Sequence, residues 1–577
     1  MPYRNRDIFK EKAVTQKVTY DDKPWLKSYE DGVPESLDYQ DELLVENLER
    51  SVKVRPGRVA LIFQGYKLTY GELGEMVGSM VACLRSFGVQ KGDRVAILLP
   101  NVIPCVAAYY AIMRLGAICV MNNPLYTDRE LEHQFNDSGA RLLITLDLLA
   151  DRMVKLREKT AIKEIIYTSI GDYLPFPKSL LFPLVGKRKK LAAHVTPAPG
   201  VYKWKEMISQ HAPSDFHEEV AMDDVAMYQY TGGTTGVSKG VMLTHRNLSC
   251  QIQQTASWFP KFEVGNEVAL GALPFFHIFG LSIGMNLPIA MGWTTVLVPK
   301  PQAPQLLEVI RKHKPTFAPM VPTMYVGMIH HPDIEKTDLS CIKGCFSGSA
   351  PLPVEVTREF EKRSGSVIVE GFGLTETSPV THMNPYDGGE RKVGSIGIPS
   401  PDTKARIVDL NDGTTDMPVG EVGELVIKGP QVMRGYYNRP EATEENFVDG
   451  WLRTGDIARM DEDGYFYIMD RKKDMILSGG YNVYPRDIDE VLYENPKVQE
   501  ACAIGIPHAT RGEAVKVFVV LKEGEEATQE EIINFCSDKL AKYKWPVAVE
   551  FRDDLPKSTV GKVLRKELRR QEEETKV

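Results

Sequence analysis

The sequence predicts an α/β fold in which a large N-terminal domain is followed by a smaller α+β domain. In the first half of the chain, short apolar runs alternate with segments of helical periodicity, which is typical of parallel sheets covered by helices. After residue 402 the pattern changes to short strands separated by turns such as Asn411-Asp412-Gly413, which indicates antiparallel sheet. A chain of 577 residues is also too long for one hydrophobic core, so at least two domains are expected.

Four apolar runs in the first part of the chain are predicted to be strands buried on both faces, because they show no alternation of polar and apolar residues. A helix is predicted between the second and third strands. Thr127 and Glu130 have the spacing of a capping box there, and Leu131 and Phe135 follow at helical period. The predicted strands are residues 95–99, 117–121, 142–146 and 165–168.

Two different patterns follow residue 402, and a run of five charged residues, 470–474, separates them. A charged run is usually only a solvated face, but its position makes it the best joint between domains. We therefore predict an N-terminal domain of residues 1–469 and a C-terminal domain of residues 470–577. The predicted elements are strands 405–408, 424–427, 465–469, 498–505 and 515–522, and helices 485–494 and 529–543.

The composition indicates a globular enzyme of the cytoplasm. The net charge of −8 argues against a nucleic-acid partner, which needs a basic surface. The eight cysteines are scattered without a Cys-x-x-Cys pair, so buried free thiols are expected. The N-terminus lacks the apolar core of a secretory signal. The longest apolar runs, residues 103–121 and 275–291, are interrupted by Arg114 and Asn286, so neither resembles a membrane-spanning helix.

The most informative segment is a loop rich in glycine and threonine, residues 230–240, which directly follows an apolar run. Glycines let backbone N–H groups approach an anion, hydroxyls add donors and Lys239 adds a positive charge, so the loop is predicted to bind phosphate. The spacing of the P-loop motif is absent. A flexible linker is the alternative, which the lysine and the flanking hydrophobic segments disfavour. The candidate residues are Thr231, Gly232, Gly233, Thr234, Thr235, Gly236 and Lys239.

Four further clusters carry side chains suited to a nucleotide. Residues 347–350 form a small-residue turn that a planar ligand can approach closely, and residues 370–377 combine an aromatic face, a hydroxyl and a carboxylate. Residues 451–456 offer one acid at a turn, and residues 556–562 place a lysine on a loop near the C-terminus. Each cluster alone has an ordinary explanation, such as packing, a turn or solvent exposure.

Together, and in this order, the five motifs resemble those of the adenylate-forming superfamily of acyl-CoA synthetases, aryl-CoA ligases, luciferases and peptide-synthetase adenylation domains. The resemblance covers nearly the whole chain, and the joint occurrence of five motifs is highly specific. It implies a large N-terminal domain of two α/β sheet subdomains plus a β-barrel-like subdomain, with a small mobile α+β C-terminal domain after a hinge. Asp470 stands at the position of the hinge residue.

The resemblance also implies how ATP and Mg²⁺ are held. The loop 231–239 would wrap the β- and γ-phosphates, Thr375 would touch the α-phosphate, and Glu376 would be the Mg²⁺ ligand. Asp456 would accept hydrogen bonds from both ribose hydroxyls, and Arg471 would support the same sugar. The adenine side of the site would be formed by Gly348, Ser349, Ala350, Glu370, Gly371, Phe372 and Gly373, with Phe372 stacked on the base.

The implied chemistry explains these residue types. A carboxylate becomes reactive when it attacks the α-phosphorus of ATP and forms an acyl-adenylate. Mg²⁺ and Lys562 would neutralise the repulsion between the two anions and stabilise the transition state. The thiol of coenzyme A would then displace AMP, after the small domain rotates and withdraws Lys562. Gly479 and Gly480 would line the pantetheine tunnel in that second state.

A weaker resemblance concerns the acid. Residues 122–134, 384–387 and 428–433, with an entry segment near Trp25, resemble bacterial-type long-chain fatty acid–CoA ligases. The acyl pocket of such relatives corresponds to residues 275–291, which are apolar and offer no partner for a substrate amine. His277 would line the carboxylate end of that pocket, and a hydrogen-bonded core histidine is the alternative.

The resulting hypothesis is a fatty acid–CoA ligase that acts on medium or long chains and releases AMP and pyrophosphate. An acyl-AMP ligase that loads a carrier protein, a ligase for aryl or medium-chain acids and a catalytically silent nucleotide sensor are the alternatives. Two further hypotheses stay open. Residues 174–190 combine apolar bulk with four basic residues, so they either contact an anionic membrane at its inner face or pack on their own domain. A homodimer is the other open hypothesis.

Overall fold

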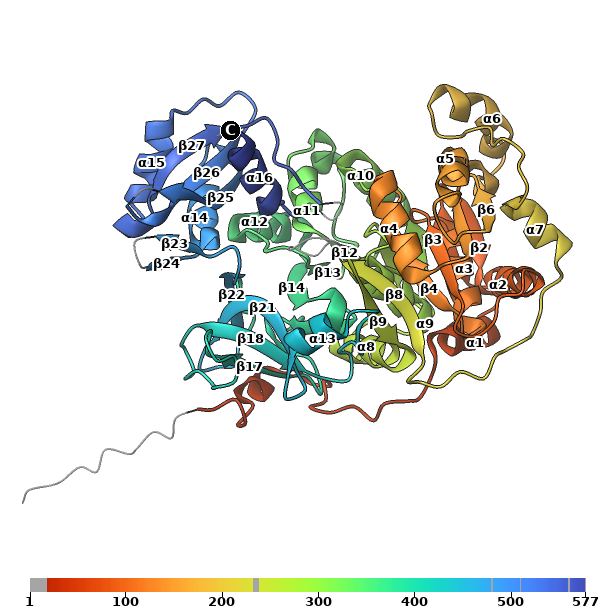
Figure 1. Ribbon diagram of the computed structural model, residues 1–577, viewed down its shortest axis with the longest axis horizontal. Helices are drawn as coiled ribbons and strands as arrows, with labels where there is room; N and C mark the ends of the chain where they lie inside the picture. The colour runs from red at the N-terminus through yellow and green to blue at the C-terminus, as the bar shows by residue number, and fades with distance from the viewer. Residues whose placement is uncertain (1–17, 232–237, 479–480, 509, 559–560, 576–577) are drawn as a thin grey trace, which may run out of the picture.

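The computed structural model describes residues 18–231, 238–478, 481–508, 510–558 and 561–575. Within them the chain forms four β-sheets. Three belong to a large N-terminal part, and the fourth belongs to a small C-terminal part that lies beside it at one end (Figure 1). The predicted α/β fold class, with a large and a small domain, is confirmed.

The first sheet has eight strands, and its centre is parallel as the continuous apolar runs predict. All four strands predicted in the first part of the chain are present, and their ends lie within one residue of the predicted ones. At one edge of the sheet two antiparallel strands are added: β9 pairs with β8, and β19 pairs with β9. The strands are β3 (Arg94–Leu98), β4 (Ile118–Met121), β5 (Leu142–Leu146), β6 (Glu164–Thr168), β7 (Val201–Lys203), β8 (Val225–Thr231), β9 (Lys239–Thr244) and β19 (Gly435–Tyr436).

The second sheet has nine strands. The six strands from β1 to β14 in its spatial order are parallel, and antiparallel strands lie at both edges. Because β13 and β14 are parallel neighbours, the segments that follow them leave the sheet at the same edge. Two of the predicted clusters, residues 347–350 and 370–377, begin within these two strands and continue into these segments. The strands are β1 (Val59–Phe63), β2 (Tyr66–Thr69), β10 (Val268–Gly271), β11 (Thr294–Leu297), β12 (Phe317–Met320), β13 (Gly344–Ser347), β14 (Val367–Gly373), β15 (Val380–Met383) and β16 (Ile398–Pro399).

The helix predicted between the second and third strands is α4 (Asp128–Ser138), and its capping box is present. The Glu130 carboxylate accepts the Thr127 N–H at 2.8 Å, and the Thr127 side chain accepts the Glu130 N–H. The other helices of the large part are α1 (Leu44–Val54), α2 (Tyr70–Ser86), α3 (Ile103–Arg114), α5 (Asp147–Arg157), α6 (Lys178–Arg188), α7 (Trp204–Gln210), α8 (His245–Trp258), α9 (Leu287–Ala290), α10 (Ala303–His313), α11 (Pro322–Ile329), α12 (Val354–Ser364) and α13 (Pro440–Asn446).

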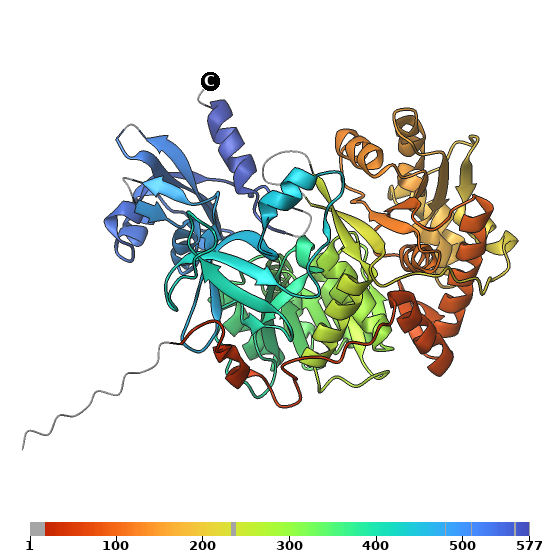
Figure 2. The same ribbon diagram turned by 60° about the horizontal axis from the view of Figure 1, so that its bottom comes forward.

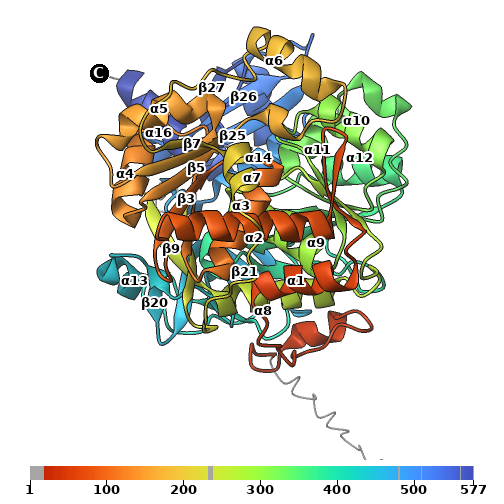
Figure 3. The same cartoon turned by 90° about the vertical axis from the view of Figure 1, so that its right-hand side faces the viewer.

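Helix α3 is buried on all sides, as its uniformly apolar sequence requires. Its one charged residue, Arg114, pairs with Glu49 at 2.9 Å. Helices α2 and α1 lie side by side across the same region (Figure 3). One continuous hydrophobic core includes residues from both large sheets and from these helices. Among the described residues, no helix combines the length and the hydrophobicity needed to cross a membrane.

The third sheet is antiparallel, as the turn pattern after residue 402 predicts. It lies next to the small C-terminal part (Figure 2). Its last strand continues through Arg471, so the chain leaves this sheet inside the charged run 470–474. The predicted boundary at residue 470 therefore falls within a strand. The strands are β17 (Lys404–Val408), β18 (Gly423–Lys428), β20 (Phe447–Val448), β21 (Trp451–Met460) and β22 (Phe466–Arg471).

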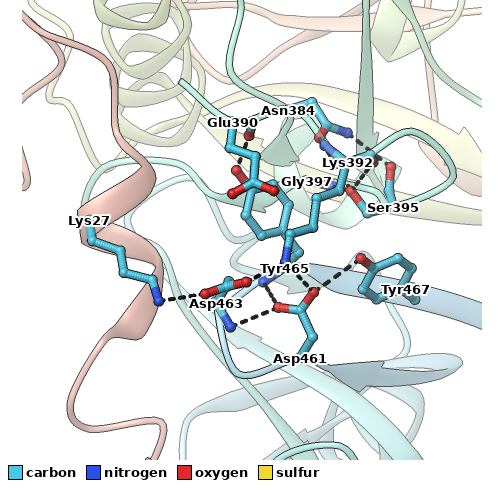
Figure 4. A network of polar contacts seen from close by, with 10 residues as sticks. All are labelled: Lys27, Asn384, Glu390, Lys392, Ser395, Gly397, Asp461, Asp463, Tyr465 and Tyr467. Carbon is cyan, nitrogen blue, oxygen red and sulfur yellow. Dashed lines mark hydrogen bonds and ion pairs between the residues drawn. The ribbon is translucent and has the colours of Figure 1, made fainter. Parts of the chain in front are cut away.

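An ion cluster fastens the N-terminal segment to this third sheet (Figure 4). The Lys392 ammonium group lies 2.8 Å from Asp461 and 2.6 Å from Asp463, and Asp463 also pairs with Lys27 at 2.6 Å. Lys27 belongs to a short 3₁₀ helix, η1 (Pro24–Ser28). The segment before the first strand is thus held by the turn that joins β21 to β22.

The small part has its own sheet and its own hydrophobic clusters. One prediction there is wrong: the helix expected at 529–543 ends at Ser537, and residues 542–544 form a separate 3₁₀ turn. Pro546 keeps the preceding Trp545 extended, so a helix cannot run into the next strand. The elements are β23 (Ile476–Ser478), β24 (Tyr481–Val483), β25 (Val498–His508), β26 (Gly512–Leu521), β27 (Pro546–Phe551), α14 (Pro485–Tyr493), α15 (Gln529–Ser537) and α16 (Arg565–Thr575).

Candidate active site

Among the described residues, four of the five predicted clusters, all except the phosphate loop, contribute to a cavity of about 830 Å³ between the large and the small part. The segments after β13 and within β14 form one wall, and α11 and the chain before α16 form others. The site is therefore shared by both parts of the molecule. The predicted residues that line the cavity are Ser349, Ala350, Glu370, Gly371, Phe372, Gly373, Asp456, Arg471 and Lys562.

Lys562 reaches the cavity from a tight turn of the small part. The Ser558 N–H donates to the Lys562 carbonyl at 2.8 Å, and the Lys562 N–H donates to the Ser558 hydroxyl at 3.1 Å. Burial lowers the pKa of Lys562 to about 8, and the positive charge of Arg471 acts in the same direction, whereas Asp456 opposes it. Anionic substrate oxygens would restore the favourable interactions that this ammonium group loses on burial.

Asp456 and Arg471 form a buried ion pair opposite this lysine. They face each other across β21 and β22, and Arg471 Nε lies 2.7 Å from Asp456 Oδ1. The second carboxylate oxygen, Oδ2, is buried without a hydrogen-bond donor among the described residues. Burial raises the pKa of Asp456, and the Arg471 charge opposes that rise. A buried acceptor of this kind suits a ligand hydroxyl, which is the role that the ribose prediction needs.

Close packing requires glycine on both sides of Phe372. A β-carbon on Gly371 would lie 2.3 Å from the Phe346 ring, and one on Gly373 would lie 1.9 Å from the Pro379 carbonyl. The Phe372 ring is half-buried at the cavity and meets the His382 ring edge-on, with centroids 6.1 Å apart. The exposed face of the ring can accept a flat base, as the adenine prediction requires.

Three more predicted residues on the adenine side have distinctive environments. Ser349 has a positive φ of 71°, a conformation that non-glycine residues rarely adopt outside functional turns. Gly348 lies against Phe279, because a β-carbon there would be 3.2 Å from that ring. Glu370 is buried, and burial raises its pKa to about 7, so its carboxyl group can donate as well as accept a hydrogen bond near neutral pH.

Glu376 lies in a short 3₁₀ turn, η5 (Thr375–Thr377), directly after the predicted α-phosphate ligand Thr375. Its Oε1 atom accepts a hydrogen bond from the Tyr436 hydroxyl at 2.8 Å, and its backbone carbonyl accepts the Met433 N–H at 2.8 Å. Tyr436 was not among the predicted site residues. A detectable signal in the sequence was the aromatic pair Tyr436-Tyr437, which is separated by two residues from the ligase-like segment 428–433.

The predicted phosphate loop joins two antiparallel strands, with Thr231 paired to Lys239 at its base. His133 of α4 bonds the Ser238 carbonyl through Nε2 at 2.9 Å, and this contact fixes one end of the loop. Lys239 reaches over the Tyr436 ring, with its Nζ atom 4.8 Å from the centroid. The predicted residues that lie outside the described part of the chain are Gly232, Gly233, Thr234, Thr235, Gly236, Gly479 and Gly480.

Comparison with known proteins identifies the family. Residues 48–437 match the AMP-binding enzyme family, and residues 487–562 match the AMP-binding enzyme C-terminal domain. The chain belongs to the AMP-binding enzyme family. It is 45% identical over 557 residues to a long-chain-fatty-acid–CoA ligase of Bacillus subtilis (strain 168), covering 96% of this chain and 98% of that protein. It is 41% identical over 554 residues to a long-chain-fatty-acid–CoA ligase of Escherichia coli O6:H1, covering 95% and 98%.

Solved structures are similar to this chain over most of its length. ATP-bound MatB from Rhodopseudomonas palustris is 30% identical and gives a TM-score of 0.81, covering 92% of this chain and 99% of that one. The apo form of the same protein gives a TM-score of 0.72 at the same identity and coverage. The overall fold of our chain is therefore more similar to the ATP-bound structure than to the apo structure.

Glu376 of this AMP-binding enzyme has the chemistry of a Mg²⁺ ligand. Mg²⁺ is usually bound through one or two carboxylates together with substrate phosphates and water. Within the described ranges, no group of three or more His, Cys, Asp or Glu side chains could hold a metal ion alone. A half-buried carboxylate with one oxygen oriented by Tyr436 fits an ion that takes its remaining ligands from ATP.

His277 does not line the cavity. Its Nδ1 atom accepts the Phe279 N–H at 3.3 Å, and burial lowers its pKa to about 4, so the imidazole is neutral at physiological pH. It still lies near the site, because Phe279 contacts Gly348. Its predicted role at the carboxylate end of the acyl pocket stays a prediction.

Proposed function

We propose that this protein is an AMP-forming long-chain fatty acid–CoA ligase. In the first half-reaction, a carboxylate oxygen of the fatty acid bonds to the α-phosphorus of ATP, the bond to the bridging oxygen breaks, and pyrophosphate leaves. In the second, the thiol of coenzyme A loses its proton and bonds to the acyl carbon, and AMP leaves. The observation that carries the proposal is the meeting of Lys562 with Asp456 and Arg471 in one cavity.

The residues of the cavity have complementary tasks in the first half-reaction. Asp456 and Arg471 orient the ribose, and Phe372 supports the base, so the α-phosphate is presented to the acid in a fixed position. The Lys562 ammonium group lies between the two reacting anions and stabilises the charge that develops on the α-phosphate oxygens. When bound at Glu376, Mg²⁺ supplies further neutralisation of phosphate charge.

The large part supplies the environment for the acyl chain. Residues 278–291 are buried, apart from Met291, which is only half-buried, and most of them are apolar. They include a π-helical turn, η3 (Gly280–Asn286), an irregularity that is frequent at functional sites. Identities of 41% and 45% to long-chain-fatty-acid–CoA ligases support a long acyl chain as the substrate.

A pyrophosphate-exchange assay over a panel of acids tests the proposal. Long-chain acids are expected to give ATP–pyrophosphate exchange without coenzyme A, and AMP and acyl-CoA with it. Exchange with no increase in AMP release on addition of coenzyme A would favour a ligase that loads a carrier protein. Formation of ADP instead of AMP would contradict the proposed chemistry, and a complete lack of acid-dependent exchange would favour a nucleotide sensor.

We further propose that α6 rests on an anionic lipid surface. The helix packs on its own domain through Phe182, which lies against Gly171. Other apolar side chains of the same segment point outward: Phe176, Leu180 and Leu181 are 82%, 70% and 54% exposed. Exposed apolar side chains near Lys189 and other basic residues suit the interface of an acidic bilayer. In Figure 1, α6 lies at the outer edge of the molecule.

Vesicle flotation tests this surface. Leu180→Glu with Leu181→Glu is expected to reduce binding to vesicles containing anionic phospholipid and to leave turnover of a water-soluble acid unchanged. Val547→Glu, at an exposed apolar residue of β27 in the small part, is the matched control. Equal flotation of all three proteins would contradict the lipid contact. The predicted homodimer is a separate hypothesis, which sedimentation velocity of the wild-type protein without vesicles would test.

A further inference from the structure

Tyr436 belongs to none of the predicted motifs and does not line the cavity, but several contacts fix its position. It lies in the two-residue strand β19, which pairs with β9 through Tyr436 and Val241. Its N–H donates to the Thr443 hydroxyl at 2.9 Å, and its side chain is buried. The preceding Gly435 has a φ of 145°, and a β-carbon there would lie 2.8 Å from Thr443 Cγ2. Both the backbone and the ring of Tyr436 are therefore fixed.

The fixed side chain touches two predicted phosphate-site residues that come from distant parts of the sequence. Its hydroxyl donates to Glu376 Oε1 at 2.8 Å. The Lys239 ammonium group lies 4.8 Å from the centre of its ring, within the range of a cation–π contact. Lys239 ends the phosphate loop, and Glu376 is the candidate Mg²⁺ ligand. Tyr436 is the described side chain that joins them.

We propose that Tyr436 is a positioning residue that sets the Mg²⁺-binding carboxylate and the phosphate-loop lysine in register for MgATP. A carboxylate has two oxygens, so a hydrogen bond to one of them orients the other without occupying it. Groups that orient a metal ligand in this way typically change metal affinity or activity by about 10- to 100-fold when removed. The ring keeps Lys239 close to the loop, where its charge can meet the terminal phosphates.

A purely structural role makes different predictions, and Tyr436→Phe separates the two. Phenylalanine keeps the ring, its burial and the Lys239 contact, and removes only the hydroxyl that binds Glu376. A structural role predicts a lower melting temperature or no effect. The positioning role predicts a specific loss in the coupling between metal and ATP, because the carboxylate is no longer oriented.

The coupling can be measured without turnover. The dissociation constant of ATP is determined by calorimetry on the full-length protein, once in EDTA and once with Mn²⁺, whose free concentration is followed by electron paramagnetic resonance. The dissociation constant in EDTA divided by the dissociation constant with Mn²⁺ reports how much the metal strengthens ATP binding. Tyr436→Phe is expected to lower this ratio about 10- to 100-fold, the range typical of removing a group that orients a metal ligand, with an unchanged dissociation constant in EDTA.

Three further variants complete the test. Glu376→Gln is expected to lower the ratio at least as much as Tyr436→Phe. Tyr437→Phe is the matched control, because Tyr437 is the next residue and stacks on Tyr228 at 4.4 Å instead; it is expected to leave the ratio unchanged. Tyr436→Leu also removes the ring beside Lys239, so it is expected to weaken ATP binding in EDTA as well.

Two outcomes would overturn the inference: a wild-type ratio for Tyr436→Phe, or an equal loss in Tyr437→Phe. The inference rests on the proposed function, but its test does not use an acid or coenzyme A. If ATP binds and the ratio changes while no acid supports exchange, the proposed substrate is wrong and the positioning role stands. If exchange occurs normally and the ratio is unchanged, only the positioning role fails.

Discussion

Gly561 of the small part lies directly against Thr323 of α11, because a β-carbon on Gly561 would come within 2.2 Å of Thr323 Oγ1. Gly561 also has a positive φ of 74°, which favours glycine. The next residue is Lys562. The approach of Lys562, the proposed catalytic lysine, to the cavity therefore depends on a contact between the two parts that only a residue without a side chain can make.

Gly561→Ala is expected to slow adenylate formation about 10- to 100-fold, since a small displacement of a catalytic group can cost 10²-fold in rate. Thioester formation from preformed acyl-AMP is expected to continue, because the small domain is predicted to adopt another orientation in that step. Separate assays of ATP–pyrophosphate exchange and of acyl-AMP consumption by coenzyme A measure the two half-reactions. Combining it with Thr323→Ala, which removes the clashing atoms, should restore part of the loss. An equal decrease in both half-reactions would contradict this account.

Lys562→Ala should show the same division between half-reactions, with a loss of about 10²- to 10³-fold in adenylate formation, because it removes the ammonium group itself. The measurement is the same pair of assays. A lysine needed in both steps would lower the two rates together. Because the side chain is half-buried in a turn of its own, the melting temperature is expected to change little.

The pH dependence follows from the environment of Lys562. Its pKa is lowered to about 8 by burial, so in the free enzyme the charged form predominates below that pH and is lost above it. The kcat/KM for adenylate formation is therefore expected to fall about tenfold per pH unit above pH 8. In Lys562→Arg the charge persists, so the reduced activity should show no such fall. A wild-type profile that stays flat to pH 10 would contradict the requirement for the charged form.

Local patterns predicted most of the elements of this fold, because their signals lie within a few residues. The continuous apolar runs became parallel strands, and the Thr127–Glu130 capping box began α4 where expected. The pairing of β19 with β9 could not be predicted in this way. A strand of two residues has no periodicity, and its partner lies about 200 residues earlier, so only the tertiary fold brings Tyr436 to the phosphate loop.

The site also contains some residues that the sequence predicted and others that it could not predict. The residues predicted around Phe372 and Asp456 line one cavity, although Phe372 belongs to β14 of the second sheet and Asp456 to β21 of the third sheet. Residues that only position other groups could not be predicted from the sequence. Thr323 provides the surface against which Gly561 packs. Arg486 holds the chain near the predicted hinge residue, because its backbone N–H donates to Asp470 at 2.9 Å and its guanidinium group donates to the Ile468 carbonyl at 2.7 Å. Neither residue type has a chemical signature that a motif reveals.

Asp456 offers a test of the nucleotide site that uses the substrate as the probe. Its buried Oδ2 acceptor predicts that wild-type enzyme prefers ATP to 2′-deoxy-ATP or 3′-deoxy-ATP, since an analogue without the hydroxyl leaves that oxygen unpaired. In Asp456→Asn the preference is expected to shrink about tenfold or more, because the charged acceptor is lost. The measurement is kcat/KM for each nucleotide in the exchange assay. Equal discrimination in both proteins would place the ribose elsewhere.

Lys392 is expected to stabilise the fold without touching catalysis. Lys392→Met leaves the Asp461 and Asp463 carboxylates near each other in a partly buried site, which should lower the free energy of unfolding by about 1–3 kcal/mol. Lys27 and Lys392 hold the pKa of Asp463 at about 2, below its ordinary value of 3.8. This contribution to stability is therefore present above pH 4 and is lost as the pH falls towards 2. Urea denaturation at pH 7 and pH 3 measures both effects.

Lys261→Met is the control for this prediction, because Lys261 forms a single ion pair with Asp387 and the two side chains are 62% and 49% exposed. Removing such a pair usually costs less than about 1 kcal/mol. The two variants should both keep wild-type exchange activity at saturating substrates, since neither lysine lines the cavity. If Lys392→Met is no less stable than Lys261→Met, the ion cluster at the N-terminal segment contributes no more to stability than an ordinary surface ion pair. The N-terminal segment must then be held by apolar contacts such as that of Trp25 with Phe466.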